Sequence, residues 1–287
     1  MKKLLFIFIS LSMCFFVRAQ TIFVWPGDAN NDGIVNNLDI LNIGSAFSKQ
    51  GNARAVLQTN WSEFEVLKWN DTLPNGLNVG YADCSGNGFV NIEDAYAVEL
   101  NYGETNSNFN GLTFTQGTIN DPLLTVVATD SFWQPGDTAL LTVFINQTNS
   151  DSLYNIAFTL NYDTALIQEA TINMLPHPQF GGGGRQPIFV QKNYEDNGFI
   201  EFGISRTNNK NHGGSLAIAS VSFIIEDNLI GKSFLDAANA FHLSHIKMFN
   251  KEMQEKPVMG DTVSAKIITT ISEKKLAQQV SIYPIPA

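Results

Sequence analysis

Cysteine is nearly absent from this chain, with two residues in 287. Cys14 lies in an N-terminal apolar stretch, so loss of that stretch leaves Cys84 alone and excludes an internal disulfide. Four histidines are present, and no serine stands in a Gly-x-Ser-x-Gly setting. The glycines at 181–184 are not followed by Gly-Lys-Ser/Thr, which excludes a phosphate-binding P-loop. Because no internal disulfide can form, something else must stabilise the fold.

Basic residues are also few. The chain has 17 Lys and Arg against 27 Asp and Glu, a formal net charge of −10. An acidic chain is a poor candidate for binding nucleic acid and a reasonable one for binding divalent cations. Apart from the N-terminus, no apolar run is long enough to cross a membrane, so we expect no transmembrane segment.

Residues 1–19 have the features of a secretory signal peptide. Lys2 and Lys3 precede an apolar run, and Val17-Arg18-Ala19 offers small residues for cleavage before Gln20. Cleavage changes the net charge to −13, because it removes two lysines and an arginine but no acid. We expect a secreted or extracellular protein, either released or attached to the cell surface; lipidation at Cys14 is the alternative.

Two twelve-residue segments share one pattern: DANNDGIVNNLD at 28–39 and DCSGNGFVNIED at 83–94. Each has a glycine at position six and enters a pattern of helical spacing. An EF-hand-type loop supplies oxygen ligands to Ca²⁺ from positions 1, 3, 5, 7, 9 and 12, the seventh through its backbone carbonyl. The predicted ligands are Asp28, Asn30, Asp32, Ile34, Asn36 and Asp39 in the first loop, and Asp83, Ser85, Asn87, Phe89, Asn91 and Asp94 in the second.

The loops predict two calcium ions of unequal affinity. The first loop offers three carboxylates and the second two, and ligand charge tunes affinity, so we expect the first site to bind more tightly. The alternative is a pair of Asx-rich helix entries in which Asn36 or Asp39 acts as a cap. Cys84, at the non-ligand position two, is predicted to point outward as a spectator.

The tandem loops and helices resemble dockerin type I repeats over 24–105. No helix precedes either loop, and an insert at 50–80 separates the two units more widely than in a compact dockerin. Dockerins bind cohesins through helix residues and late loop positions. The resemblance therefore implies a set of partner-binding residues, namely Asn37, Leu38, Leu41, Ile92, Glu93 and Tyr96.

From about residue 120 the composition changes: short runs rich in Val, Ile, Thr and Phe are separated by turn residues. This spacing predicts an antiparallel β-sandwich. The runs are LLTVVATD, TALLTVFIN, YNIAFTLNYD, GFIEFGIS and LAIASVSFII. The Pro-Gly-Asp turn, Leu-x-Tyr-Asp and Gly-x-Leu-Ala elements resemble a cohesin over 120–268, with a jelly-roll or immunoglobulin-like architecture implied. The whole chain is thus expected to be a multidomain α + β protein.

The last segment, 269–287, reads as a polar linker and the start of another domain. Its VSIYPIPA resembles the beginning of the sorting domain of Bacteroidetes proteins exported by type IX secretion, with Ile285 in place of the usual Asn.

The sequence favours a non-catalytic, calcium-binding scaffolding or adhesion protein. Its partner would be a protein of cohesin or dockerin type, or a second copy of the chain. The alternative is a carbohydrate-binding accessory protein of a polysaccharide-degrading system, for which Trp133 and Phe180 are the first candidate aromatic residues. An enzyme is not expected: the HLSH motif at 242–245 offers two possible metal ligands without a third nearby, so a solvated or capping role is favoured.

Overall fold

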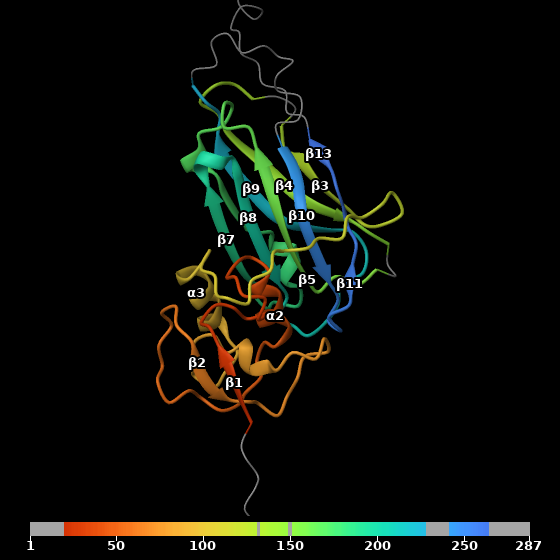
Figure 1. The fold of residues 1–287 in the computed structure, drawn as a ribbon. Coiled ribbons are helices and arrows are strands. Elements are labelled where there is room, and N and C mark those ends of the chain that lie inside the picture. The colour runs from red at the N-terminus through yellow and green to blue at the C-terminus, as the bar shows by residue number, and fades with distance from the viewer. Residues whose placement is uncertain (1–19, 131–132, 149–150, 228–240, 264–287) are drawn as a thin grey trace, which may run out of the picture.

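The computed structural model describes residues 20–130, 133–148, 151–227 and 241–263. The predicted signal peptide at 1–19 and the tail at 269–287 lie outside these ranges. Among the described residues, no helix has the length and apolar character needed to span a membrane. Figure 1 shows a helical module, red to yellow, against one end of a β-sandwich, green to blue.

The helical module is built on the two predicted loop–helix units. The helices are α2 (Asp39–Ser45) and α3 (Ile92–Leu100), with a short 3-10 turn, η1 (Val79–Tyr81), between them. Strand β1 (Thr21–Val24) pairs antiparallel with β2 (Phe64–Leu67) at the far end of the module. The 50–80 insert covers the module core with Trp69, which is buried.

Two sheets form the sandwich. The first runs in the order β11-β10-β5-β8-β7, with β13 also pairing to β10, and the second in the order β12-β3-β4-β9-β6. All pairings are antiparallel except β12 with β3. The strands are β3 (Leu123–Ala128), β4 (Thr138–Asn146), β5 (Asn155–Tyr162), β6 (Asn173–Pro176), β7 (Ile188–Tyr194), β8 (Phe199–Ser205), β9 (Leu216–Ile224), β10 (Phe241–Phe249), β11 (Glu255–Lys256), β12 (Met259–Gly260) and β13 (Thr262–Val263). Short helical turns lie at η2 (Glu169–Thr171), α4 (Pro178–Gly181) and η3 (Glu195–Asn197).

The predicted antiparallel sandwich is confirmed. All five apolar runs are strands, namely β3, β4, β5, β8 and β9, whereas β7 and β10 were not anticipated. Alternate residues of β4 are buried, as a half-buried strand requires. Phe158, Leu160 and Tyr162 share the inner face of β5 and belong to the core between the sheets, as the alternation predicts.

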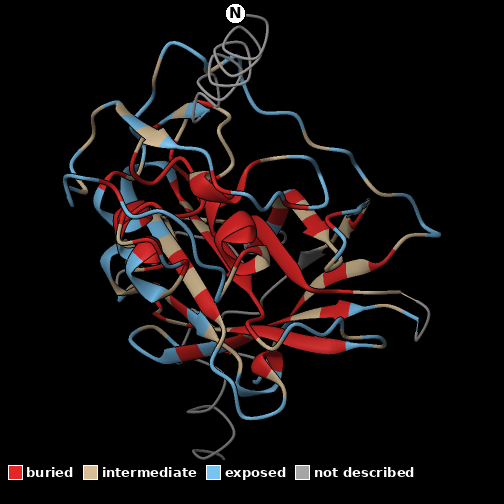
Figure 2. Cartoon of the chain, turned by 90° about the horizontal axis from the view of Figure 1, so that it is seen from below, coloured by how far each residue is buried: buried red, intermediate tan, exposed pale blue. Residues whose placement is uncertain are grey.

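Strand β5 departs from simple alternation, because it is buried on both faces. Ala157 and Thr159 point away from the sandwich core and are still 0% and 4% exposed. Ala157 joins the core of the helical module, since α2 packs over β5 and β8. Figure 2 shows buried residues running through the middle of the molecule from the helices into the strands. The first sheet is therefore covered by its own N-terminal module.

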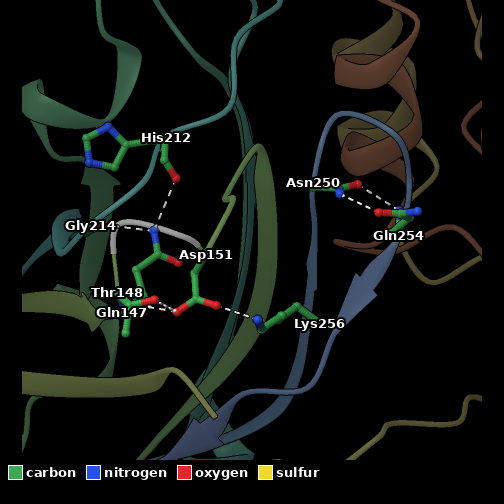
Figure 3. A network of polar contacts seen from close by, with 8 residues as sticks. All are labelled: Gln147, Thr148, Asp151, His212, Gly214, Asn250, Gln254 and Lys256. Carbon is green, nitrogen blue, oxygen red and sulfur yellow. Dashed lines mark hydrogen bonds and ion pairs between the residues drawn. The ribbon is translucent and has the colours of Figure 1, made fainter.

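A polar network ties down one edge of the sandwich (Figure 3). Asp151 forms an ion pair with Lys256 at the end of β11, and this contact lowers the pKa of the Asp151 carboxyl. The Gln147 side-chain amide donates to the carbonyls of His212 at 3.2 Å and Gly214 at 2.9 Å. These contacts hold the loops between strands.

Candidate ion-binding loops and the faces of their helices

The two loop–helix units are related as a repeat with a spacing of 55 residues, and each braces the loop of the other. After α2, the backbone N–H of Ser48 donates to the Val90 carbonyl of the second loop at 2.8 Å. After α3, Gly103 donates to the Val35 carbonyl of the first loop at the same distance. The pairing extends to two isolated β-bridges, Gln50 with Phe89 and Thr105 with Ile34. The loops are thus held by backbone pairing from outside.

In the first loop, the carboxylates at positions one and twelve point inward. Asp28 is 1% exposed and Asp39 is fully buried. Each carboxylate oxygen accepts one backbone N–H of the loop, which explains how the chain turns so tightly around the two side chains. These bonds are Asp32 N and Gly33 N to Asp28, at 3.1 Å each, and Asn30 N and Asn36 N to Asp39, at 3.1 and 2.8 Å.

The first loop gathers negative charge away from water. Burial, and next to it the charge of Asp32, raises the pKa of Asp28 to about 7. Burial, and then the charges of Asp28 and Asp32, raises the pKa of Asp39 well above its usual range. Lys247 on β10 lies near enough for its charge to lower the pKa of Asp32, although burial raises it overall. Buried carboxyls this close in sequence and charge call for a cation to become stable as anions.

The second loop repeats the arrangement with fewer charges. Asp94 is fully buried, and its oxygens accept the backbone N–H groups of Ser85 at 2.8 Å and Asn91 at 2.7 Å. Asp83 accepts Gly88 N at 3.1 Å through one oxygen. Burial raises the pKa of Asp83 to about 6 and that of Asp94 to about 7.

Two polar atoms at ligand positions of the second loop are buried without a partner. The Oδ1 atom of Asp83 and the hydroxyl of Ser85 make no hydrogen bond. The Ser85 hydroxyl lies close enough to lower the pKa of both Asp83 and Asp94, yet it bonds to neither. A buried oxygen without a hydrogen bond is costly, and both atoms sit at positions one and three of the pattern. The donor set therefore fits a hard cation.

Within the described residues, no three His, Cys, Asp or Glu side chains are already gathered as they would be around a bound metal. The loops instead mix carboxylates with amides, a hydroxyl and backbone carbonyls. Local helix-entry bonds are also present: Asn36 accepts Leu38 N at 2.7 Å, and Asn91 accepts Glu93 N at 2.7 Å. At α3 the bond belongs to a capping box formed by Asn91 and Asp94, as the alternative interpretation expects, whereas α2 has no side-chain cap. Capping therefore accounts for Asn91 and part of the role of Asp94, but not for the burial of Asp28 and Asp83. The ligand roles of Asn87 and of the Ile34 and Phe89 carbonyls stay predictions.

The prediction that Cys84 points outward is wrong. Cys84 is 2% exposed and belongs to the core of the helical module, with its Sγ 3.5 Å from the Tyr81 carbonyl. Burial raises the pKa of its thiol well above the usual range. Ala29, at the same position of the first loop, is also fully buried. Position two faces inward because the loop wraps over the core with its ligand side turned away.

The N-terminal end of α2 docks on the first sheet of the sandwich. The Asn37 side-chain amide bridges two strands, donating to the carbonyls of Phe158 on β5 and Phe202 on β8 at 3.2 Å each. Asn155 reaches back from β5 to the Leu41 carbonyl at 2.9 Å. Both asparagines are buried, so these bonds satisfy polar groups that water does not reach.

Two glycines permit this close approach. A β-carbon on Gly203 of β8 would lie 2.2 Å from the Asn37 carbonyl oxygen, and one on Gly44 of α2 would lie 1.9 Å from the Ser205 hydroxyl. The outer end of the contact is closed by Tyr102, whose hydroxyl donates to Glu201 at 2.7 Å. The helix therefore touches the backbone of the sheet, and a single core continues from one module to the other.

The residues predicted to bind a partner divide into two groups. Asn37, Leu38 and Leu41 are at most 5% exposed; Asn37 and Leu41 hydrogen-bond the sandwich of their own chain, and Leu38 belongs to the core of the helical module. The structure thus makes them unavailable to a separate partner, because the sandwich already covers them. At the equivalent positions of the second unit, Ile92 is 45% and Tyr96 59% exposed, and Glu93 is exposed beside them.

Comparisons with protein-family models and with curated proteins gave no match. Among solved structures, similar chains are cohesins. They include the sixth cohesin of scaffoldin B from Acetivibrio cellulolyticus, solved in complex with a dockerin (12% identity, 51% of this chain, 99% of that chain, TM-score 0.40). The type II cohesin A11 from Bacteroides cellulosolvens matches with the same identity and coverage and a TM-score of 0.41. A non-cellulosomal cohesin from Archaeoglobus fulgidus is 16% identical over 56% of this chain and 99% of its own, with a TM-score of 0.36. At these values the likeness assigns no function to the chain.

The aromatic residues predicted as a sugar-binding platform are not at the surface. Trp133 is 2% exposed and packs edge-on against Phe223, while Phe180 is fully buried under Arg206. That prediction is wrong, because both rings belong to the core between the sheets. The His pair of the HLSH motif lines a cavity of about 290 Å³ with Phe114, whose ring meets His245 at 4.9 Å.

Sequence reasoning missed two charged residues near the loops, Arg54 and Lys247, and a third, Glu201, which accepts the Tyr102 hydroxyl where the modules meet. Arg54 lies in the insert against the second loop, and the other two come from the sandwich. The two segments that brace the loops have no residue types in common at equivalent positions, so the sequence shows no repeat there. The three charged residues lie in segments that carry no recognisable sequence motif. Their positions relative to the loops depend on how the two modules pack together.

Proposed function

We propose that this protein is a non-catalytic, calcium-binding module of an extracellular protein assembly, exported through its N-terminal signal peptide. Its dockerin-like part is held on its own cohesin-like sandwich and presents the second helix to a protein partner. The observation that carries the proposal is the asymmetry of the repeat. The same helix positions are buried on the chain's own sheet in α2 and exposed in α3.

Calcium would be held by the twelve loop residues predicted from the sequence. The buried carboxyls Asp28, Asp39, Asp83 and Asp94, together with the unpartnered Ser85 hydroxyl, support this assignment. A bound divalent ion neutralises the carboxylates and stabilises the folded form by mass action. In a chain without disulfides, the ion then does the work of a cross-link, and it fixes the starting points of α2 and α3.

The surface offered to the partner lies along α3. Ile92, Tyr96 and Leu100 follow one another at intervals of four residues, so they form a stripe on one helix face, and all are at least 45% exposed. Exposed Phe89 extends the stripe onto the second loop. Glu93 and Glu99 lie at its sides and are exposed. An apolar stripe with an acidic rim, on a chain of net charge −10, fits a partner whose apolar surface has a basic rim.

A photo-crosslinking amino acid in place of Tyr96, introduced into the mature chain, tests this surface. In calcium, and in the secreted fraction of the producing cells, we expect one adduct that weakens with added salt. Ile92→Ser should abolish the adduct. The same crosslinker at Leu57, which is 64% exposed on the insert, is the matched control.

Equal capture from positions 96 and 57, or an adduct that survives both Ile92→Ser and chelator, would rule the surface out. Sedimentation of the mature chain alone, with calcium and with chelator, decides whether the partner is a second copy. A constant monomer mass is expected, because the acidic rims of two copies repel each other.

A further inference from the structure

Arg54 is a buried arginine fastened to the second loop. Its backbone N–H donates to the Gly86 carbonyl at 2.8 Å, and its Nη2 atom donates to the Cys84 carbonyl at 2.7 Å. A third bond runs from Nη2 to the Gln58 carbonyl within the insert at 3.0 Å. The residue is only 8% exposed. The insert thus delivers one guanidinium group to the outer side of positions two and four of the loop.

Gly86 makes room for this group. A β-carbon at Gly86 would lie 1.8 Å from the Arg54 Nε atom, and the backbone there has φ +77, which glycine adopts without strain. On its other side, the guanidinium carbon lies 4.8 Å from the ring centroid of Phe64 on β2. The group is therefore clamped between an aromatic ring and the loop.

Hydrogen bonds alone do not account for the burial of this cation. The Nε and Nη1 atoms of Arg54 are buried without a partner. A buried charge with unsatisfied donors is costly unless opposite charge lies nearby. The opposite charge here comes from Asp83 and Asp94, which both raise the pKa of Arg54 against the lowering effect of burial. In turn, Arg54 lowers the pKa of Asp83.

The first loop is built differently at the matching place. The residue 55 positions after Arg54 is Phe109, whose backbone N would lie 2.4 Å from a β-carbon on Gly33. The first loop therefore has three carboxylates and no guanidinium at this place; the cation that acts on it is Lys247 of the sandwich, next to Asp32. The second combines Asp83 and Asp94 with a guanidinium, which leaves it with a much smaller negative charge.

We propose that Arg54 is an internal cation of the second loop, which holds this loop in its ion-binding shape without calcium and weakens calcium binding to it. The reason is Coulombic: the guanidinium stabilises the same carboxylates that the ion needs, and it repels a divalent ion. The second loop would then be a permanently formed, low-affinity site, and the first loop the one that calcium orders. The effect on affinity rests on the proposed calcium binding, whereas the bracing does not.

Calorimetric titration of calcium into the mature chain separates charge from packing. Arg54→Gln removes the charge, and Arg54→Lys is the matched variant that keeps it. We expect Arg54→Gln to tighten the weaker site by about tenfold or more, a change of 1.36 kcal/mol per factor of ten, while Arg54→Lys stays within about threefold of the wild type. Equal affinities in the two variants, or weaker binding in Arg54→Gln, would overturn the proposal.

Hydrogen exchange of the wild-type chain in chelator tests the bracing without any substitution, so it also serves if the variants fail to fold. The N–H groups of Ser85 and Asn91, bonded to Asp94, should exchange at least about tenfold more slowly than those of Asn30 and Asn36, bonded to Asp39. Equal protection of the two loops, or faster exchange in the second, would contradict it. A flat titration of the wild type would refute calcium binding itself, while the exchange order would still decide whether Arg54 braces the loop.

Discussion

Asn37 and Ile92 occupy the same position in two loop–helix units, yet one is buried in the chain's own sandwich and the other faces water. Asn37 is 5% exposed and donates to two strand carbonyls, whereas Ile92 is 45% exposed. The amide of Asn37 can hydrogen-bond the backbone of the sheet at close range, whereas the apolar side chain of Ile92 is exposed to water. The first unit therefore turns this position toward the sandwich, whereas the second unit, whose helix α3 contacts β7 through other residues, leaves it exposed.

Asn37→Ala should destabilise the protein more than Ile92→Ala, the substitution at the equivalent position of the second unit. The substitution removes two hydrogen bonds, so the buried carbonyls of Phe158 and Phe202 each lose a donor that water does not replace. We expect the free energy of unfolding to fall by about 1–3 kcal/mol. Ile92→Ala, on the exposed helix, should change the free energy of unfolding by no more than about 0.5 kcal/mol. Urea unfolding in calcium measures both, and equal costs would contradict the docking described for α2.

Gly203→Ala should loosen the contact between the modules. Its β-carbon would overlap the Asn37 carbonyl oxygen, 2.2 Å away, so the helix or the strand must shift. We expect a loss of about 1–3 kcal/mol, as for overpacking in a core. Gly76→Ala is the comparison, because position 76 has open space around it and only its φ of +87 is unfavourable, at roughly 1–2 kcal/mol. Faster hydrogen exchange of α2 in Gly203→Ala alone would locate the damage at the docked face.

The first calcium site should bind more tightly than the second. Asp32 supplies the third carboxylate of the first loop, where the second loop has Asn87, and charge count tunes affinity. Asp32→Asn should therefore weaken the tighter site and bring the two affinities together in a calorimetric titration. The reverse substitution, Asn87→Asp, should tighten the weaker one. A wild-type protein in which the weaker site is assigned to the first loop would show this ranking to be mistaken.

Without calcium, the protein should lose stability as the pH rises from about 4 to 7. The folded-state pKa values of Asp28 and Asp94 are raised to about 7 and that of Asp83 to about 6, above the unfolded value of about 3.9. In this window the native state holds more protons than the unfolded chain, so the free energy of unfolding falls with increasing pH. The melting temperature in chelator should be higher at pH 5 than at pH 7.5.

Calcium should reverse this trend, because the ion replaces the protons on the ligands. Asp28→Asn should flatten the slope in chelator, since it removes one titrating carboxyl. His212, whose pKa is lowered by burial, acts in the opposite direction around its unfolded value, and His212→Gln is the control that removes its contribution. A melting temperature in chelator that rises steadily with pH in His212→Gln would contradict the prediction.

Local patterns could be read from the sequence because they depend on neighbouring residues. A twelve-residue loop brings its acids together through its own backbone, so Asp28 and Asp39 could be paired in advance. The alternation of Phe158, Leu160 and Tyr162 indicated one face of a strand for the same reason. Cys84 could not be placed in this way, since which side of a loop faces the core depends on what lies beneath it.

The sequence by itself determined that the chain has two acidic loop–helix units and a β-rich second part, because spacing and periodicity act over a few residues. Only the tertiary structure decided that Asn37 and Leu41 of the first unit are buried against the sandwich, whereas the equivalent Ile92 and Tyr96 of the second unit are exposed. The bonds from Asn37 to Phe158 and Phe202 join residues 121 and 165 positions apart. Such contacts form when two complementary surfaces meet, and Gly44 and Gly203 allow the first helix to approach the sheet closely.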